Sequence, residues 1–125
     1  MSRPVLEPTA EHPITIEPTP GRVVVRIGDT VVANSEHSLT LQESTYPAVQ
    51  YIPLADVDQS LLRRTDTESY CPFKGDASYY SVQTADGSTV TDAIWTYEQP
   101  YAAVSEIKDH VAFYPDKAAV TVESA

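Results

Sequence analysis

The sequence predicts a mainly antiparallel β domain with two or three short helices. Three observations point to this class: β-branched runs separated by turn-forming residues, polar and apolar residues that alternate with a period of two, and only short stretches of helical spacing. Ten prolines and four glycines in 125 residues indicate many fixed bends. A chain of this length can bury one hydrophobic core. We therefore expect one β domain over residues 13–125 and an extended arm over residues 1–12.

The first third of the chain predicts the arm and then four strands. Closely spaced prolines favour extended backbone, with a short edge strand at Ile14–Glu17, because proline cannot donate to a sheet. Arg22–Ile27 and Thr30–Ser35 are β-branched runs joined by Gly28-Asp29, the pattern of a β-hairpin. Ser38–Glu43 alternates polar and apolar residues, which predicts a further strand with one face in the core.

The middle of the chain predicts a strand, a short helix and a loop. Val49–Ile52 is a β-branched and aromatic stretch that ends at a proline. Leucines recur at near-helical spacing within Leu54–Arg64, so we expect a short helix there. Thr65–Gly75 contains turn-forming residues and no period, so we expect irregular structure. Gly75 is expected to take a positive φ where the next strand begins.

The last third predicts a second hairpin, a helical turn and two closing strands. Ala77–Thr84 and Ser88–Glu98 are strand-like arms joined by a short turn, and both carry aromatic residues. Ala102–Lys108 is long enough for one or two helical turns, and a proline separates it from the hairpin. His110–Tyr114 and Ala118–Glu123 are the last two expected strands.

Charge and hydropathy exclude several classes of partner. Eighteen acidic residues against eight Lys and Arg give a net charge of −10, which opposes attraction to phosphate backbones and anionic lipids. No apolar run approaches the roughly 20 residues that span a bilayer, and Met1–Pro20 lacks the apolar middle of a secretory signal. We therefore expect a soluble cytoplasmic protein with neither a nucleic-acid nor a membrane partner.

Four motifs, in this order, resemble one small family, domain of unknown function 427, which also carries a nucleotidyltransferase-like label. The motifs are Tyr51-Ile-Pro-Leu-Ala-Asp-Val57, Cys71-Pro-Phe-Lys-Gly-Asp-Ala-Ser-Tyr-Tyr80, Ile94-Trp-Thr-Tyr97 and Val111-Ala-Phe-Tyr-Pro115. The resemblance covers about residues 14–123 and implies antiparallel β-tent-like sheets, but it implies little about activity. Many β-tent proteins hold zinc between two cysteine pairs, whereas this chain has one cysteine, so we expect neither a metal nor a cofactor.

The Cys71–Gly75 segment contains the candidate reactive residues. Cys71 is a possible nucleophile, because the Lys74 ammonium three residues on could favour its thiolate. Pro72 has no N–H to stabilise an oxyanion, so burial of Cys71 as a small apolar side chain is the favoured alternative. Lys74 could grip an anionic ligand, but an ion pair with Asp76, Glu43 or another carboxylate is favoured. The order Lys74-Gly75 does not match a phosphate-binding loop.

Carboxylates and histidines give weaker signals. Asp56 and Asp58 have the spacing of a magnesium-binding pair, but their place before a predicted helix favours capping. Glu43 ends a strand and could act as an acid or base if folding brings it near Lys74, or it could be solvated. The histidines lack a metal-ligand spacing, and His12 lies in the arm, so structural or solvent-facing roles are favoured.

The aromatic residues of the second hairpin are the candidate ligand-binding wall. Tyr79 and Tyr80 are adjacent and point to opposite faces, whereas Trp95 and Tyr97 share one face. One of the two tyrosines is therefore expected beside Trp95 and Tyr97, and Tyr51 of the preceding strand joins the candidates. Such walls line ligand pockets, but aromatic cross-strand pairs are also ordinary sheet packing, which is the favoured alternative.

The leading functional hypothesis is a domain that binds a small anionic or aromatic metabolite between the Cys71–Gly75 segment and the hairpin that carries Trp95. Irregular segments positioned by a rigid scaffold are where binding residues concentrate. The first alternative is a small-molecule enzyme that uses Glu43, Lys74 or a tyrosine for proton transfer, or Cys71 as nucleophile. The second alternative is an interaction module that pairs through a strand edge, or a homodimer.

Overall fold

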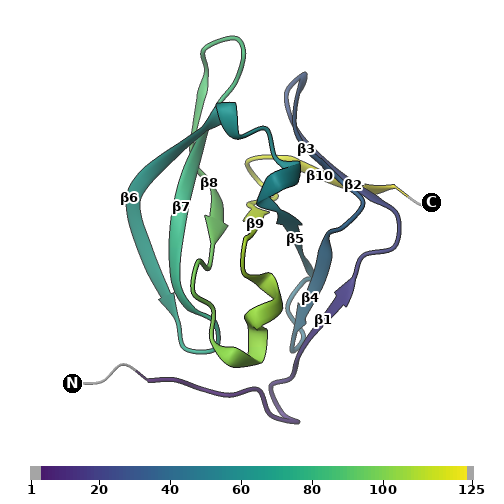
Figure 1. Ribbon diagram of the computed structural model, residues 1–125, viewed down its shortest axis with the longest axis vertical. Coiled ribbons are helices and arrows are strands. Elements are labelled where there is room, and N and C mark those ends of the chain that lie inside the picture. The colour runs from purple at the N-terminus through teal and green to yellow at the C-terminus, as the bar shows by residue number, and fades with distance from the viewer. Residues whose placement is uncertain (1–3, 124–125) are drawn as a thin grey trace.

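The computed structural model describes residues 4–123, which form two antiparallel sheets (Figure 1). The larger sheet has the strand order β1-β4-β5-β9-β8-β7-β6, and the smaller sheet has the order β10-β2-β3. The strands are β1 (Ile14–Pro18), β2 (Arg22–Ile27), β3 (Thr30–Ser35), β4 (Leu39–Glu43), β5 (Val49–Pro53), β6 (Leu62–Cys71), β7 (Gly75–Gln83), β8 (Thr89–Thr96), β9 (His110–Phe113) and β10 (Ala119–Glu123). The 3-10 helices are η1 (Leu54–Asp56), η2 (Gln59–Leu61) and η3 (Ala102–Ile107).

The mainly β class is confirmed, while the β-tent arrangement stays a prediction. The prediction of a helix over Leu54–Arg64 is wrong, as is that of irregular structure over Thr65–Gly75. Two single 3-10 turns, η1 and η2, bring Leu54 and Leu61 against the core, and the chain then enters the edge strand β6. An edge strand with most side chains exposed carries polar residues and therefore resembles a loop in sequence.

Alternation along the strands divides the buried residues into two clusters. The first lies on the face of the larger sheet that the smaller sheet covers, and it includes Val25 of β2, Ile52 of β5 and Ile94 of β8. The second includes Tyr51, and Trp95 packs against it. These two residues are the direct neighbours of Ile52 and Ile94 in sequence, so their side chains point to the opposite face. This second face carries the candidate site.

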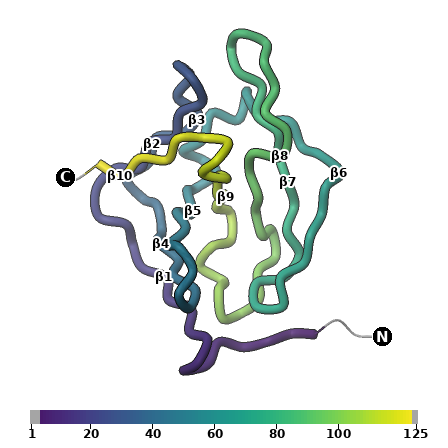
Figure 2. The backbone as a smooth tube through the Cα atoms, turned by 180° about the vertical axis from the view of Figure 1, so that it is seen from behind, coloured from purple at the N-terminus to yellow at the C-terminus, as the bar shows by residue number. Residues whose placement is uncertain are grey.

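The larger sheet bends, so that β6, β7 and β8 stand on one side and β1, β4 and β5 on the other, with β9 between them (Figure 1). The N-terminal segment before β1 crosses one end of the molecule beneath both sides, and the view from behind shows the same path (Figure 2). Leu6 N donates to Pro72 O at 2.9 Å, and the Tyr70 hydroxyl donates to Pro4 O at 2.6 Å. These bonds hold the segment against the loop between β6 and β7.

The outer edge of β6 is irregular and charged. Its pairing register with β7 shifts between Arg64 and Glu68, and both of these side chains are exposed. Bulges and charges on an edge strand oppose pairing with another chain, so association through this edge stays a prediction without support from the geometry. Among residues 4–123, no helix is long and apolar enough to cross a membrane.

Candidate functional site

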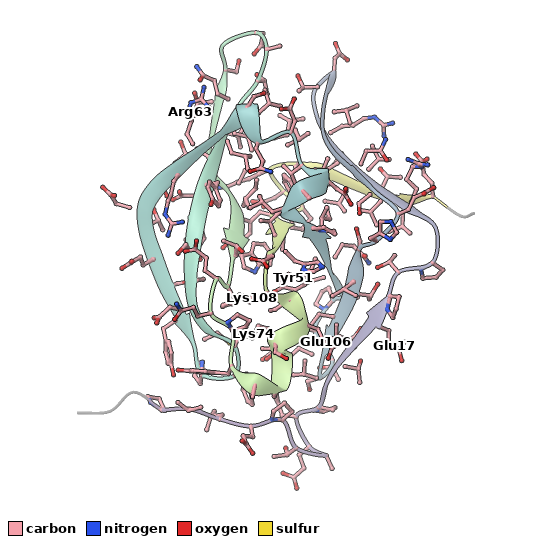
Figure 3. The ribbon with its side chains drawn as sticks, viewed as in Figure 1. Glu17, Tyr51, Arg63, Lys74, Glu106 and Lys108 are labelled. Carbon is pink, nitrogen blue, oxygen red and sulfur yellow. The ribbon has the colours of Figure 1, made fainter. Side chains whose placement is uncertain are left out.

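A cavity of about 660 Å³ opens on the second face of the larger sheet. One wall comes from β4, β5 and residues 46–48 of the turn that joins them, and the opposite wall comes from β7, β8 and the end of β9. Val120 and Val122 of β10 also line the cavity. The predicted site residues that line it are Glu43, Tyr51, Lys74, Tyr79, Trp95 and Tyr97. Tyr51 and Lys74 lie near the centre of the molecule, whereas Glu17 and Arg63 lie at its margin (Figure 3).

Strand periodicity and register place these residues together. Leu41 and Glu43 are two apart on β4 and therefore face the same side, and Leu39 of that strand pairs with Tyr51 of β5. Across the cavity, Tyr79 of β7 is the direct cross-strand partner of Trp95. The prediction that one tyrosine of the hairpin lies beside Trp95 is therefore confirmed.

The aromatic rings contact one another and form a continuous wall. Trp95 Nε1 donates to the Tyr51 hydroxyl at 3.2 Å, and these two rings meet edge to face at 6.4 Å between centroids. Trp95 also lies 4.5 Å from the ring of Tyr114, centroid to centroid. The Tyr114 hydroxyl donates to the Tyr79 hydroxyl at 3.3 Å, which in turn bonds to Ser69 at 2.8 Å. These contacts hold the rings in place before any ligand enters.

Tyr97 differs from the other tyrosines of the wall. Tyr97 is only 8% exposed, and it lines the cavity. Its hydroxyl makes no hydrogen bond to any group within residues 4–123. Burial raises the pKa of both Tyr97 and Tyr51 above the usual value of 10.0, so both hydroxyls stay protonated at neutral pH.

The polar end of the cavity is an ion pair between Lys74 and Glu43, as one of the sequence alternatives predicts. Lys74 is 7% exposed, its Nζ donates to Glu43 Oε1, and Nζ lies 3.8 Å from Cys71 Sγ. The loop holds the lysine by its backbone, because Lys74 N donates to Cys71 O at 3.2 Å and Tyr101 N donates to Lys74 O at 3.0 Å. Gly75 has φ +112°, which confirms the positive φ expected there.

His12 completes this ion pair, although sequence analysis did not assign it to the site. Its Nε2 donates to Glu43 Oε2 at 2.8 Å, and its ring stacks on Phe73 with centroids 4.4 Å apart and planes 7° from parallel. The N-terminal segment therefore reaches the Lys74–Glu43 ion pair through His12. No local pattern predicted this, because His12 and Glu43 are 31 residues apart and meet only when the segment crosses the molecule.

Burial and hydrogen bonding act in opposite directions on Glu43. Burial raises its pKa, while the hydrogen bonds from Lys74 and His12 lower it, and the net pKa lies below the usual 4.5. Each carboxylate oxygen already accepts one of these bonds. Glu43 is therefore ionised at neutral pH and is a weak base.

The lowered pKa of Glu43 predicts a loss of stability in acid. The charged carboxylate stabilises the fold fully above its unfolded pKa, near 4.5, and this contribution disappears as the pH falls through the lower folded pKa. Wild type should exceed Glu43→Gln in free energy of unfolding by about 1 to 2 kcal/mol near pH 6 and by progressively less as the pH falls below 4.5. Urea unfolding across this range measures the difference. Glu17→Gln, at an exposed position of β1, is the control, and a pH-independent Glu43→Gln difference would contradict the assignment.

Two predicted residues do not line the cavity. Cys71 packs against the second cluster, and its sulfur lies 3.8 Å from Lys74 Nζ. Tyr80 points to the opposite face, packs against the first cluster, and lies beneath the guanidinium of Arg64 at 5.9 Å from the ring centroid. Conversely, Tyr46 and Tyr114 line the cavity and were not predicted. Tyr114 stood at the end of an expected strand, but nothing in that strand indicated which face it would reach.

Asp56 and Asp58 bond to different partners. Asp58 caps η2 by accepting from Ser60 N, which confirms a capping role, and Asp56 accepts from the Ser35 hydroxyl at 2.6 Å. In the part of the chain that the structure describes, no group of three or more His, Cys, Asp and Glu side chains could hold a metal ion. Asp56 and Asp58 therefore do not form the magnesium-binding pair that was the alternative to capping.

Comparison with known proteins agrees with the motifs. No curated protein matches the chain. Residues 15–124 match the family described as domain of unknown function (DUF427), and this span includes every strand from β2 to β10 and all cavity-lining positions named above. The match covers most of the 125 residues. The chain thus belongs to the DUF427 family.

Proposed function

We propose that this domain binds an uncharged, ring-containing small molecule in the cavity. The observation that carries the proposal is the wall of Tyr51, Tyr79, Trp95, Tyr97 and Tyr114 around a volume of about 660 Å³. Ligand pockets commonly enclose about 300 to 1,000 Å³ and combine apolar walls with a few fixed polar groups. Ring faces favour flat partners through offset and edge-to-face contacts.

The charge balance of the cavity supports an uncharged ligand over an anionic one. Lys74 is the cation that would bind an anionic ligand, but its charge is already balanced by the Glu43 carboxylate. An anion entering the cavity would lose hydration and approach that carboxylate. A flat ring loses little hydration and gains contact with the aromatic wall.

The enzymatic alternative draws less support from the same geometry. Both oxygens of Glu43 accept hydrogen bonds, and its pKa is lowered by Lys74 and His12 against the opposing effect of burial, so it is poorly suited to take a proton. Cys71 lies outside the cavity lining, so a ligand in the cavity does not meet its sulfur. Binding is therefore the function that these residues support best.

Trp95 is the only tryptophan, so its indole N–H signal in a proton–nitrogen NMR spectrum reports directly on the cavity. We expect uncharged two-ring compounds such as 1-tetralone and tetralin to shift this signal, with dissociation constants below about 1 mM. Val49→Phe enlarges a side chain that lines the cavity and should abolish the shift.

The matched control is Val31→Phe, which makes the same change at an exposed position of β3 outside the cavity lining. It should leave binding unchanged. If neither compound shifts the Trp95 signal, or if both Val→Phe variants bind as wild type does, the proposed function is wrong.

A further inference from the structure

We propose that the ligand of this cavity carries a neutral carbonyl-type oxygen, and that the Tyr97 hydroxyl selects for it by donating a hydrogen bond. This inference rests on the proposed function and names the chemical class of the group recognised. It comes from the hydrogen-bond capacity that the folded chain leaves unused around the cavity.

Donors outnumber available acceptors at the cavity. Tyr97 has an unused O–H, as described above, and the Tyr51 hydroxyl accepts from Trp95 but donates to no group within residues 4–123. Lys74 Nζ carries three hydrogens, of which one bonds to Glu43 and one is directed to a sulfur at 3.8 Å. In the described chain the third has no partner. A ligand oxygen that accepts hydrogen bonds satisfies these groups.

The carboxylate and amide oxygens of the side chains that line the cavity are already engaged. Each Glu43 oxygen accepts one bond, from Lys74 or from His12. The Gln50 amide is bonded through Oε1 to Thr19 at 2.7 Å and through Nε2 to Thr40 at 3.1 Å. A ligand whose only polar group is a donor would have to compete for these oxygens, so an acceptor is the better complement.

Charge separates a carbonyl from a carboxylate or phosphate. The tyrosine hydroxyls remain protonated at neutral pH because burial raises the pKa of Tyr97 and Tyr51, so they offer neutral donors. Among the described residues that line the cavity, Lys74 is the only Lys or Arg, and Glu43 balances its charge. A buried anionic ligand requires a compensating positive charge, and the charge of Lys74 is already compensated by Glu43. The class that fits is a ring bearing a ketone or amide oxygen.

The test compares three ligands of similar size by the shift of the Trp95 indole N–H: 1-tetralone, tetralin and 2-naphthoate. One additional hydrogen bond to an otherwise unpaired hydroxyl should make 1-tetralone bind about fivefold to tenfold more tightly than tetralin. We expect 2-naphthoate to bind more weakly than 1-tetralone. Tyr97→Phe keeps the ring but removes the hydroxyl, so it should remove most of the preference for 1-tetralone over tetralin.

Tyr80→Phe removes the same hydroxyl from the opposite face of the sheet and is the matched control, for which the full ketone preference is expected. The comparison of 1-tetralone with tetralin in wild type needs no variant, so it holds even if Tyr97→Phe does not fold. Equal binding of these two compounds, tighter binding of 2-naphthoate, or a ketone preference that survives in folded Tyr97→Phe would each overturn the inference. In those cases ring binding itself stands, whereas failure of both 1-tetralone and tetralin to shift the Trp95 signal would overturn the proposed function.

Discussion

Lys74→Met is expected to lower the free energy of unfolding by about 2 kcal/mol. The substitution keeps most of the length of the side chain but removes the ammonium that donates to Glu43. Glu43 has a side chain only 17% exposed, so its carboxylate would remain partly desolvated, with His12 as its remaining side-chain hydrogen-bond partner. Urea unfolding monitored by Trp95 fluorescence measures the loss.

Two controls separate a buried pair from an ordinary ion pair. Arg22→Met removes the cation of an exposed pair with Glu36, and it should change stability by less than about 0.5 kcal/mol. Lys74→Met combined with Glu43→Gln should be more stable than the sum of the single changes predicts, because the unpaired carboxylate is removed as well. If Lys74→Met is no more harmful than Arg22→Met, the ion pair does not stabilise the site as we describe.

Gly75→Ala is expected to be the most damaging alanine substitution at a turn, with a loss of about 2 kcal/mol. Gly75 has φ +112°, which lies outside the left-handed region that other residues tolerate, and a Cβ there would lie 3.4 Å from Gln99 O. The strain falls on the residue directly after Lys74. We therefore expect the Trp95 indole signal to shift in the folded variant, as the ion pair is displaced.

Gly28→Ala provides the comparison. Gly28 has φ +57°, within the left-handed region, and a Cβ there would have no atom within 4 Å. Its loss should be about 1 kcal/mol, without any change in the Trp95 signal. Equal losses at the two glycines, or an unchanged indole signal in Gly75→Ala, would show that the loop after β6 does not position Lys74.

Much of the hairpin architecture could be predicted from neighbouring residues. Gly28-Asp29 between two β-branched runs is sufficient to indicate β2 and β3, because a two-residue turn brings its flanking strands together. Alternation likewise separated Tyr79 from Tyr80 before their faces were known. Which of the two meets Trp95 follows from the register of β7 against β8, and that register contains a shift between Tyr80 and Val82 that no pattern indicated.

Edge strand β6 shows where such patterns fail. Arg63–Ser69 is polar throughout and reads as a loop, yet its backbone pairs with β7 while its outer side chains meet solvent. Thr65 and Thr67 both donate to the Asp92 carboxylate, at 2.7 Å each, which holds the bulged part of the strand against β8. A run of polar residues indicates exposure to solvent, but it does not distinguish an edge strand from a loop.

The class of fold and the two hairpins follow from periodicity and turn residues, since both act between residues a few positions apart. The candidate site does not: Glu43 meets His12 from one side and Lys74 from the other, each 31 residues away in sequence. Those contacts depend on the order of strands in the larger sheet and on the path of the N-terminal segment across one end of it. The ion pair stabilises the fold only where Glu43 is partly buried and Lys74 compensates its charge, and this occurs only once distant strands have assembled.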